Sequence, residues 1–302
     1  MRHLFHWILL VLLSIVLFTC KKDQGIDEYP YANSLNYLVH DYTRSYILHV
    51  PPTYSKDVDM PLVVVMHGYT GTAENTEQWT HMSDKADEEG FIVAYPNGIP
   101  YPWNESNPQA WNCGGPWEEW TAQTDDVGFI DEMIEKISEH YSIDPNRVFI
   151  TGHSNGSMMT YRLGFELSHK IAAIAPVSGQ MVYESEEIPD YPVSVLHMHA
   201  LNDSTVKYYG QHNPKETIYE SVDSILTLLS SYYSCKTIPD TILTEDNYLV
   251  KSWSCDNTNI DIVLYVMQGG AHQWFTVENS GIDANEIIWE FFKSHPKDLT
   301  KE

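Results

Sequence analysis

Continuous apolar runs, separated by helical patterns, restrict the possible folds of this chain more than any other feature. The run Pro61–Met66 is the clearest, and Phe91–Tyr95 and Arg147–Thr151 repeat the pattern. Apolar runs without polar alternation are typical of strands that are buried on both faces, as in parallel sheets. Further strands are predicted at residues 44–50, 171–177, 192–199 and 260–267.

Helical patterns lie between the predicted strands. In Asp126–Tyr141 an apolar face recurs at helical spacing and acidic residues stand near the start, which indicates an amphipathic helix. Similar patterns predict helices at 155–168, 217–233 and 283–294. Strands that alternate with helices predict an α/β fold, with a mostly parallel sheet covered by helices on both faces. The 302 residues favour one large domain of this kind.

The first twenty residues have a different character. An apolar run, Trp7–Phe18, follows the basic Arg2 and ends close to Cys20. A short apolar run behind a positive charge is typical of a secretory signal rather than of a membrane span. The ending Leu17-Phe-Thr-Cys20 resembles a bacterial lipobox, in which the cysteine becomes the lipidated N-terminus.

The resemblance to a lipobox sets the expected domain boundaries. It predicts a signal peptide at residues 1–19, a lipidated Cys20 with a polar tether at 20–36, and one folded domain at 37–298. The protein is then exported and anchored by lipid to a membrane, in the periplasm or at the outer membrane or cell surface. The alternative is a conventional signal peptide with an incidental cysteine, which also exports the chain.

The chain is strongly acidic. It contains 42 Asp and Glu residues against 17 Lys and Arg residues, so its formal net charge is −25. Such a surface repels phosphate backbones, and we therefore expect no nucleic acid partner. Contact with a membrane is expected only through the lipid anchor.

Export permits disulfide bonds among the three remaining cysteines, Cys113, Cys235 and Cys255. Cys235 and Cys255 bracket a short polar segment, and they are the expected pair. Cys113 is then a free thiol or an alternative partner, because an odd number of cysteines leaves one over.

The strongest local motif is Gly152-His-Ser-Asn-Gly156, which lies between a predicted strand and a predicted helix. It matches the G-x-S-x-G nucleophile elbow, in which a sharp turn presents the serine above the sheet. The small flanking residues let strand and helix approach closely. Ser154 is therefore the candidate nucleophile, and the backbone N–H of Asn155 is a candidate donor to an oxyanion.

A second part of the predicted oxyanion hole follows the run Pro61–Met66. The sequence His67-Gly-Tyr69 stands where such sites have a loop that supplies a second donor. The backbone N–H of Tyr69 or of Thr70 is the candidate. His67 itself is expected to brace the loop rather than to transfer protons.

A serine nucleophile requires a general base and a carboxylate that orients the base. Asp203 follows the predicted strand at 192–199, and His272 follows the predicted strand at 260–267, in the chain order serine, acid, histidine. Both stand beyond the carboxyl ends of strands, where open α/β sheets place their sites. The predicted catalytic residues are Ser154, His272 and Asp203.

Other residues compete for roles at such a site. Asp190 and Asp223 are the alternative acids, although one precedes a strand and the other lies in a predicted helix. His197 and His199 share one face of a strand and are candidate metal ligands, but no third ligand with suitable spacing accompanies them. We therefore expect no metal and no other cofactor.

The stretch at 96–124 is long, irregular and rich in Trp, Gly, Pro and Asn. Long loops within compact domains are often functional, and aromatic rings stack on phenolic groups and sugars. The predicted substrate-binding residues are Trp111 and Trp117 in this loop, together with Trp274. The alternative is that most of these indoles pack within the protein.

Several ordered motifs also resemble one protein family. The sequence is similar to the polyhydroxybutyrate depolymerase and feruloyl/acetylxylan esterase group of α/β-hydrolases, notably in Thr151–Leu163, Ala172–Gly179 and Gly270–Trp274. The resemblance extends over residues 40–295. It implies a single-domain, cofactor-free ester hydrolase of the α/β-hydrolase fold, with the family's triad on Ser154, Asp203 and His272.

The resemblance and the aromatic loop together favour a serine ester hydrolase with an acyl-enzyme intermediate. Feruloyl or acetyl esters of plant polysaccharides are the expected substrates. One alternative is depolymerisation of polyhydroxyalkanoates or their oligomers by the same triad. The other alternative is a catalytically silent lipoprotein that binds a glycan on the hydrolase scaffold. The expected partner is accordingly a small ester, a polysaccharide or a polyester.

Overall fold

One ten-stranded sheet organises the structure, a computed structural model that describes residues 31–39, 42–100, 108–117, 121, 124–183, 189, 191–212, 217–255 and 260–297. Across the sheet, the strands follow the order β1 (Tyr31–Val39), β2 (Tyr42–His49), β4 (Ile92–Pro96), β3 (Met60–Met66), β7 (Ile143–His153), β8 (Ala173–Val177), β9 (Ser194–Ala200), β14 (Ile262–Met267), β13 (Tyr248–Trp253) and β12 (Asp240–Thr244). The strands from β4 to β14 run parallel, and antiparallel strands extend both edges.

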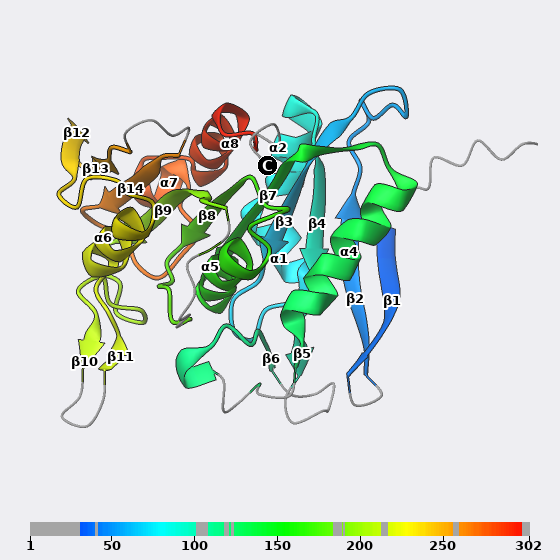
Figure 1. Cartoon of the computed structure of the whole chain (residues 1–302), viewed down its shortest axis with the longest axis horizontal. Helices are drawn as coiled ribbons and strands as arrows, with labels where there is room; N and C mark the ends of the chain where they lie inside the picture. The colour runs from blue at the N-terminus through cyan, green and yellow to red at the C-terminus, as the bar shows by residue number, and fades with distance from the viewer. Residues whose placement is uncertain are drawn as a thin grey trace, which may run out of the picture.

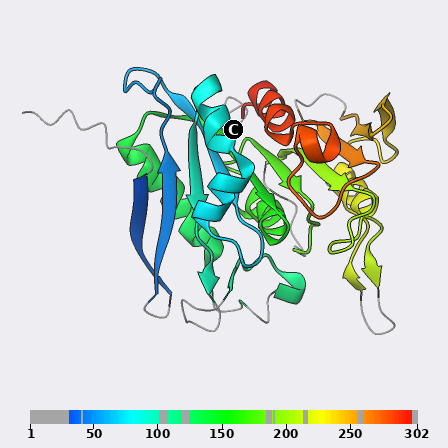
Figure 2. The ribbon, with the colours of Figure 1, turned by 180° about the vertical axis from the view of Figure 1, so that it is seen from behind.

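Helices cover both faces of this sheet, as Figures 1 and 2 show from opposite sides. The helices on one face are α4 (Asp126–His140), α5 (Asn155–Glu166) and α6 (Val222–Tyr232); those on the other are α1 (Ala73–Thr80), α2 (Met82–Glu89), α7 (Val277–Ser280) and α8 (Ala284–Ser294). The remaining elements are a 3-10 turn, η1 (Gly115–Trp117), and two small ribbons, β5 (Ile99–Pro100) with β6 (Gln109–Ala110) and β10 (Gln211–His212) with β11 (Thr217–Tyr219). The predicted α/β architecture is confirmed.

Two hydrophobic cores explain why the central strands are continuously apolar. Val64 and Ile150 belong to the core under α4, α5 and α6. Their neighbours Val63 and Phe149 belong to the core on the other face, where Phe149 stacks on Phe292 of α8 at 4.6 Å. Because successive side chains of a strand point to opposite faces, a strand between two cores needs apolar residues at every position.

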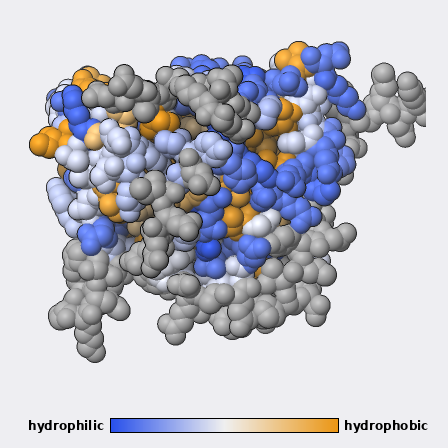
Figure 3. Space-filling model, in the orientation of Figure 1, coloured by the Kyte–Doolittle hydropathy of each residue, from blue (hydrophilic) through white to orange (hydrophobic). Residues whose placement is uncertain are grey.

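Helix α4 shows the amphipathic pattern that its sequence predicts. Phe129, Met133 and Ile137 are fully buried against the sheet, whereas Glu135 and Glu139 are exposed on the outer side. On this face of the molecule, hydrophobic residues show only as separate patches among hydrophilic ones (Figure 3).

The prediction of one helix at 217–233 is wrong at its start. Residues Thr217–Tyr219 form β11, and α6 begins at Val222. Ser221 ends the preceding extended segment and caps the helix, because its hydroxyl accepts the backbone N–H of Ser224 at 3.1 Å.

Both edges of the sheet contain strands that the sequence pattern did not predict. All five residues of β12 are exposed, so they lack the burial that produces an apolar run. Strand β1 begins at Tyr31, which pairs opposite Leu48 of β2. Residues 31–36, predicted as part of the tether, lie in β1. The rest of the tether, Cys20 and the signal peptide lie outside the described residues.

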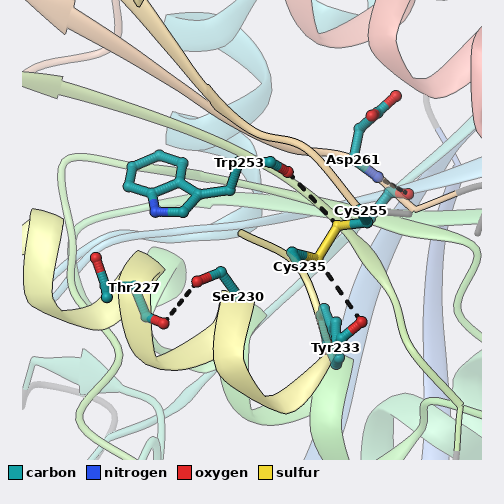
Figure 4. The surroundings of a disulfide bond; sticks show 8 residues. Thr227, Ser230, Tyr233, Cys235, Trp253, Cys255 and Asp261 are labelled. Atoms are coloured by element: carbon teal, nitrogen blue, oxygen red, sulfur yellow. Dashed lines mark hydrogen bonds between the residues drawn. A yellow bond between two sulfur atoms is a disulfide. The ribbon is translucent and has the colours of Figure 1, made fainter. Parts of the chain in front are cut away.

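A disulfide joins Cys235, which follows α6, to Cys255, which follows β13 (Figure 4). The bond links the end of α6 to the end of β13. Strands β8, β9 and β14 lie between β13 and β7, the strand that leads to the nucleophile turn. Cys113 is buried as a free thiol, and burial raises the pKa of this thiol above its usual value.

Within the described ranges, no helix is both long enough and apolar enough to cross a bilayer.

Candidate active site

The nucleophile turn lies between the end of β7 and the start of α5. Ser154 has φ of 56° and ψ of −119°, a conformation that residues other than glycine rarely adopt. Its backbone N–H donates to the carbonyl of Val177 on the neighbouring strand β8 at 3.0 Å. The strained turn is thus held by the sheet, as a nucleophile elbow requires.

The two glycines of the motif are required by close backbone contacts. A Cβ atom on Gly156 would lie 2.4 Å from the carbonyl oxygen of His67 and 2.5 Å from that of Met66. A Cβ atom on Gly152 would lie 2.7 Å from the carbonyl oxygen of Gly156. Because these neighbours are backbone atoms, no side-chain rotation relieves the clash, and helix α5 packs this closely on the sheet only with glycine at both positions.

The structure brings Ser154, His272 and Asp203 into one hydrogen-bonded row. His272 Nε2 lies 2.8 Å from Ser154 Oγ, and His272 Nδ1 lies 2.8 Å from Asp203 Oδ2. The Asp203 carboxylate is fully buried, and the imidazole of His272 is 17% exposed. In this geometry Nδ1–H donates to the carboxylate, which leaves Nε2 to accept the serine hydroxyl.

Asp203 is held by its own loop. Its Oδ1 atom accepts the backbone N–H groups of Thr205 and Val206, each at 2.8 Å. Burial alone would raise the pKa of Asp203, but the hydrogen bond and charge of His272, with the Val206 N–H, outweigh burial and lower it. The acid is therefore ionised at neutral pH and fixed toward His272.

The loop that carries His272 is anchored in the protein interior. Ser178 Oγ donates to the carbonyl of Gln273 at 3.1 Å, and the indole N–H of Trp274 donates to Asn285 Oδ1 at 3.0 Å. Trp274 is buried in the core beneath α8. The prediction that Trp274 contacts substrate is therefore wrong, since its indole is buried and bonded to Asn285.

A hydrogen bond removes one of the two candidates, Tyr69 and Thr70, for the second oxyanion donor. The backbone N–H of Thr70 donates to the carbonyl of Gln109 at 2.9 Å, so it is already engaged. Tyr69 is the remaining candidate on this loop. Asn155 is the first residue of α5, and the N–H groups of a first helical turn have no acceptor within the helix.

His67 braces the loop, as the sequence predicted. Its Nδ1–H donates to the carbonyl of Gly68 at 2.7 Å, and its Nε2 accepts the backbone N–H of Gly98 at 2.8 Å. Burial lowers the pKa of His67 to about 4, so the ring is neutral at pH 7. A neutral ring supplies the one donor and one acceptor that these contacts need.

Trp111 links the two segments that carry the candidate oxyanion donors. Its backbone N–H donates to Asn155 Oδ1 at 2.8 Å, and its indole N–H donates to the carbonyl of His67 at 2.9 Å. Asn155 Nδ2 returns a hydrogen bond to the Trp111 carbonyl at 3.3 Å. Because Trp111 is fully buried, the prediction that it contacts substrate is wrong. The sequence pattern did not show which polar groups its indole meets.

A buried ion pair supports the same segment, and sequence reasoning missed it. Arg44 of β2 and Asp126 at the start of α4 lie 2.7 Å apart, with both side chains fully buried. Asp126 Oδ2 also accepts the backbone N–H of Asn112 at 2.7 Å, next to Trp111. The two residues lie 82 positions apart in the sequence, and no local pattern pairs them.

A cleft of about 240 Å³ opens beside the nucleophile turn. Gly68 lines it, and a Cβ added to Gly68 would be 3.3 Å from Ser154 Cβ. Tyr69 and Trp79 line the cleft and are 37% and 45% exposed, which is high for large aromatic side chains. Trp117, the third predicted substrate-binding tryptophan, is half-buried and its ring lies 5.3 Å from that of Tyr69.

The cleft is electrically neutral although the chain is acidic. His153 lines it together with His67, and burial lowers the pKa of His153 to about 3. The other lining residues are glycine, tyrosine, threonine, asparagine and tryptophan. The ring of His153 lies 4.8 Å from that of Trp79 and 4.7 Å from that of His272, so it connects the cleft to the base.

Of the alternative acids, Asp223 is engaged by other residues. Asp223 accepts the Tyr208 hydroxyl at 2.8 Å and pairs with Lys251 Nζ at 2.6 Å, while Asp190 lies outside the described residues. Over the described part of the chain, no group of three His, Cys, Asp or Glu side chains is placed to hold a metal ion.

Comparison with known proteins points to a family of ester hydrolases. Residues 44–197, just over half of the chain, match the family described as Esterase PHB depolymerase. The chain is 26% identical over 262 residues to the bifunctional acetylxylan esterase/xylanase XynS20E of Neocallimastix patriciarum, covering 84% of this chain and 34% of that protein. It is 29% identical over 171 residues to feruloyl esterase B of Piromyces equi, covering 55% of this chain and 30% of that protein. The chain thus spans about a third of the length of either relative.

The fold is shared with solved esterases. Acetyl xylan esterase from Aspergillus awamori superimposes with a TM-score of 0.63 at 15% sequence identity, over 87% of this chain and 99% of that one. At this identity the similarity shows the fold alone, which is the predicted α/β-hydrolase fold.

Proposed function

Because the chain belongs to the Esterase PHB depolymerase family, we propose that it hydrolyses carboxylic esters with Ser154 as nucleophile, His272 as general base and Asp203 as the orienting acid. The observation that carries the proposal is the row of two 2.8 Å contacts that joins these side chains. A base at hydrogen-bonding distance from the nucleophile, and itself oriented by a buried carboxylate, is the arrangement that activates a serine.

The proposed reaction has two half-reactions. In the first, Ser154 Oγ attacks the ester carbonyl carbon as its proton passes to His272 Nε2, and Asp203 stabilises the imidazolium. The oxyanion faces the N–H groups of Asn155 and Tyr69. The tetrahedral intermediate then expels the alcohol, which takes the proton from His272 and leaves an acyl group on Ser154.

The second half-reaction hydrolyses the acyl-enzyme. Water gives one proton to His272 Nε2 and attacks the acyl carbonyl through its oxygen. The new intermediate breaks its bond to Ser154 Oγ, which recovers the proton, and the free acid leaves. The sum is ester plus water giving acid plus alcohol, with no cofactor in any step.

For the substrate, we favour feruloyl or acetyl esters of plant polysaccharides. The cleft supports the aryl ester: it has two exposed aromatic walls, no charged lining residue and a volume of about 240 Å³. That volume is below the range of about 300–1,000 Å³ for drug-sized ligands, and it suits one ring with its linker. Trp111 and Trp274 give no support, because both are buried.

Two alternatives remain in the test. The family's description favours the first, hydrolysis of hydroxyalkanoate polyesters or oligomers, for which the same triad would serve. The second is a silent glycan-binding protein, and the assembled triad speaks against it. We further propose export and anchoring through a lipid on Cys20, supported by the apolar run that ends at this cysteine.

The test is hydrolysis by the full chain in detergent, beside its Ser154→Ala variant. The substrates are methyl ferulate, acetylated xylan, 4-nitrophenyl acetate and a hydroxybutyrate oligomer. Turnover that depends on Ser154 supports the esterase, and a preference for methyl ferulate or acetylated xylan supports the proposed class. Preference for the oligomer would favour the depolymerase. Equal turnover by the variant, or none on any ester, would contradict the proposed function.

A further inference from the structure

Two buried histidines beside the site, His197 and His199, have no role in the reaction described above. They stand two residues apart on β9, and their rings stack with centroids 5.3 Å apart and planes within 7°. Both side chains are almost completely buried. Buried polar groups of this kind need hydrogen-bond partners, and the partners of these two form an ordered chain.

The chain of hydrogen bonds begins on the helix that follows the nucleophile. The hydroxyl of Tyr161 on α5 lies 2.7 Å from His197 Nδ1, and His197 Nε2 lies 3.0 Å from His199 Nδ1. His199 Nε2 then lies 2.8 Å from the carbonyl oxygen of Val206. Helix α5, strand β9 and the loop of Asp203 are thereby linked through side chains.

The direction of the chain follows from its last acceptor. The Val206 carbonyl accepts only, so His199 carries its proton on Nε2 and accepts at Nδ1. His197 must therefore donate from Nε2, and the Tyr161 hydroxyl donates to His197 Nδ1. With neutral imidazoles, this assignment alone satisfies all three contacts.

The hydrogen-bond chain ends at Val206, which also contacts Asp203. The backbone N–H of Val206 donates to Asp203 Oδ1 at 2.8 Å, while its carbonyl takes the hydrogen bond from His199. His199 Nε2 also lies 3.5 Å from Asp203 Oδ2, the oxygen that contacts His272. One residue, Val206, therefore connects the histidine chain to the carboxylate.

The surroundings keep the rings of His197 and His199 neutral. His199 faces His197, Asp203, the Val206 carbonyl and the ring of Tyr208 at 6.0 Å, and His272 lies beyond Asp203. Burial lowers the pKa of His199 to about 4 and that of His197 well below its usual value. A proton added to His199 Nδ1 would also face the N–H of His197, so protonation would break the chain.

We propose that His199, held by His197 and Tyr161, is a positioning residue that fixes the Asp203 loop and so keeps the carboxylate aligned on His272. The inference rests on the proposed triad. His199 then acts on the chemical step through Asp203 and has no part in binding substrate. Its loss should lower kcat at nearly constant KM, and only while Asp203 can still orient His272.

The test is a double-mutant cycle on the full chain in detergent, with 4-nitrophenyl acetate as substrate. His199→Leu is expected to lower kcat about 10- to 100-fold, with KM within about twofold of the parent, because a small displacement of a reacting group has effects of this size. In the Asp203→Asn background the same substitution should lower kcat by less than about threefold, because the contact it protects is already lost. Equal losses in both backgrounds would overturn the proposal.

A conservative variant separates positioning from packing. His199→Gln places an amide N–H where it can replace Nε2–H toward Val206, and it should recover most of the kcat that His199→Leu loses. A glutamine variant as slow as the leucine variant would contradict the assignment of the Val206 contact.

Tyr161→Phe tests the other end of the hydrogen-bond chain. It can be measured even if the His199→Leu variant does not fold. Losing one hydroxyl should lower kcat about threefold to tenfold, roughly the value of one hydrogen bond. The matched control is Tyr95→Phe, whose equally buried hydroxyl contacts Ser83 Oγ at 2.9 Å, and it should leave kcat unchanged. Equal kcat in the two variants would overturn the proposal. Activity that survives Ser154→Ala would instead refute the triad itself.

Discussion

Two regions meet at the candidate active site, and they hold their residues by different means. The nucleophile region comprises the ends of β3 and β7 and the start of α5. It depends on close backbone contact, since Gly156 has no room for a Cβ and Ser154 occupies a strained conformation. The acid–base region comprises the loops after β9 and β14. It depends on hydrogen bonds that end on Asp203 and His272.

This difference determines which changes each region tolerates. A region fixed by steric contact is disrupted by added volume, even by one apolar methyl group. A region fixed by hydrogen bonds is disrupted by a change of donor or acceptor at constant volume. The first kind of change should cost stability, and the second should cost catalysis while the protein stays folded.

The largest effect is expected from a change of polarity at constant volume in the acid–base region. Asp203→Asn keeps an acceptor for Thr205 and Val206 but turns an N–H₂ group toward His272 Nδ1, which favours the wrong tautomer. We expect kcat for 4-nitrophenyl acetate to fall about 10⁴-fold, as in other serine hydrolases with this change. The melting temperature should change little. A fall of less than tenfold would show that another group orients His272.

In the nucleophile region the corresponding test is an added methyl group. Gly156→Ala should destabilise the protein by about 3 kcal/mol or more, because its Cβ would meet two backbone carbonyls. The matched control is Gly269→Ala beside the His272 loop, where an added Cβ has nothing within 4 Å. The control should stay within about 0.5 kcal/mol of the parent in urea unfolding. Similar stabilities for the two variants would show that close backbone contact at Gly156 does not fix the nucleophile region.

Acid is expected to weaken both regions together. His67 and His153 belong to the nucleophile region and His199 to the other, and burial lowers their pKa values to about 4, 3 and 4. In the unfolded chain their pKa is about 6.5, so between pH 6.5 and 4 the unfolded state binds more protons. Stability is therefore complete above pH 6.5 and falls as the pH is lowered. We expect a loss of about 1 kcal/mol for each histidine between pH 7 and pH 5.5, measured by urea unfolding. An unchanged midpoint would show that these rings are not buried in neutral form.

The smallest effect is expected at Trp79, on the exposed aromatic wall of the cleft. Trp79→Ala should lower kcat/KM for methyl ferulate about tenfold, because an aromatic wall is lost, and leave 4-nitrophenyl acetate nearly unaffected. Tyr209→Ala, at a tyrosine that is 69% exposed, is the control and should affect neither ester. Equal losses on both esters would show that the cleft does not select the aryl ester.

The same contrast explains what the sequence predicts and what it does not. The buried strands, the elbow around Ser154 and the loop positions of Asp203 and His272 are predictable, because local patterns and chain order encode them. The partners of individual side chains are not. Trp111 and Trp274 look like ligand-binding residues in a list of aromatics, yet their indole N–H groups meet His67 and Asn285 inside the protein.

Long-range pairing is the other part that the sequence hides. Apart from the two-residue spacing of His197 and His199 on one strand, no spacing rule brings together the Arg44–Asp126 ion pair or the hydrogen bonds from Tyr161 to Val206. The edge strands β1 and β12 are missed for a related reason. Their hydrogen bonds come from a neighbouring strand, and their side chains need not be apolar.

The central claim, that Ser154 carries the acyl group, is tested most directly by trapping the acyl-enzyme. The full chain is mixed with excess 4-nitrophenyl acetate, quenched in acid within milliseconds and analysed by mass spectrometry of its peptides. We expect a burst of about one nitrophenol per chain, and an acetyl group on the peptide that contains Ser154. Neither should occur in the Ser154→Ala variant. An acetyl group on another residue, or a burst that persists in the variant, would contradict the account.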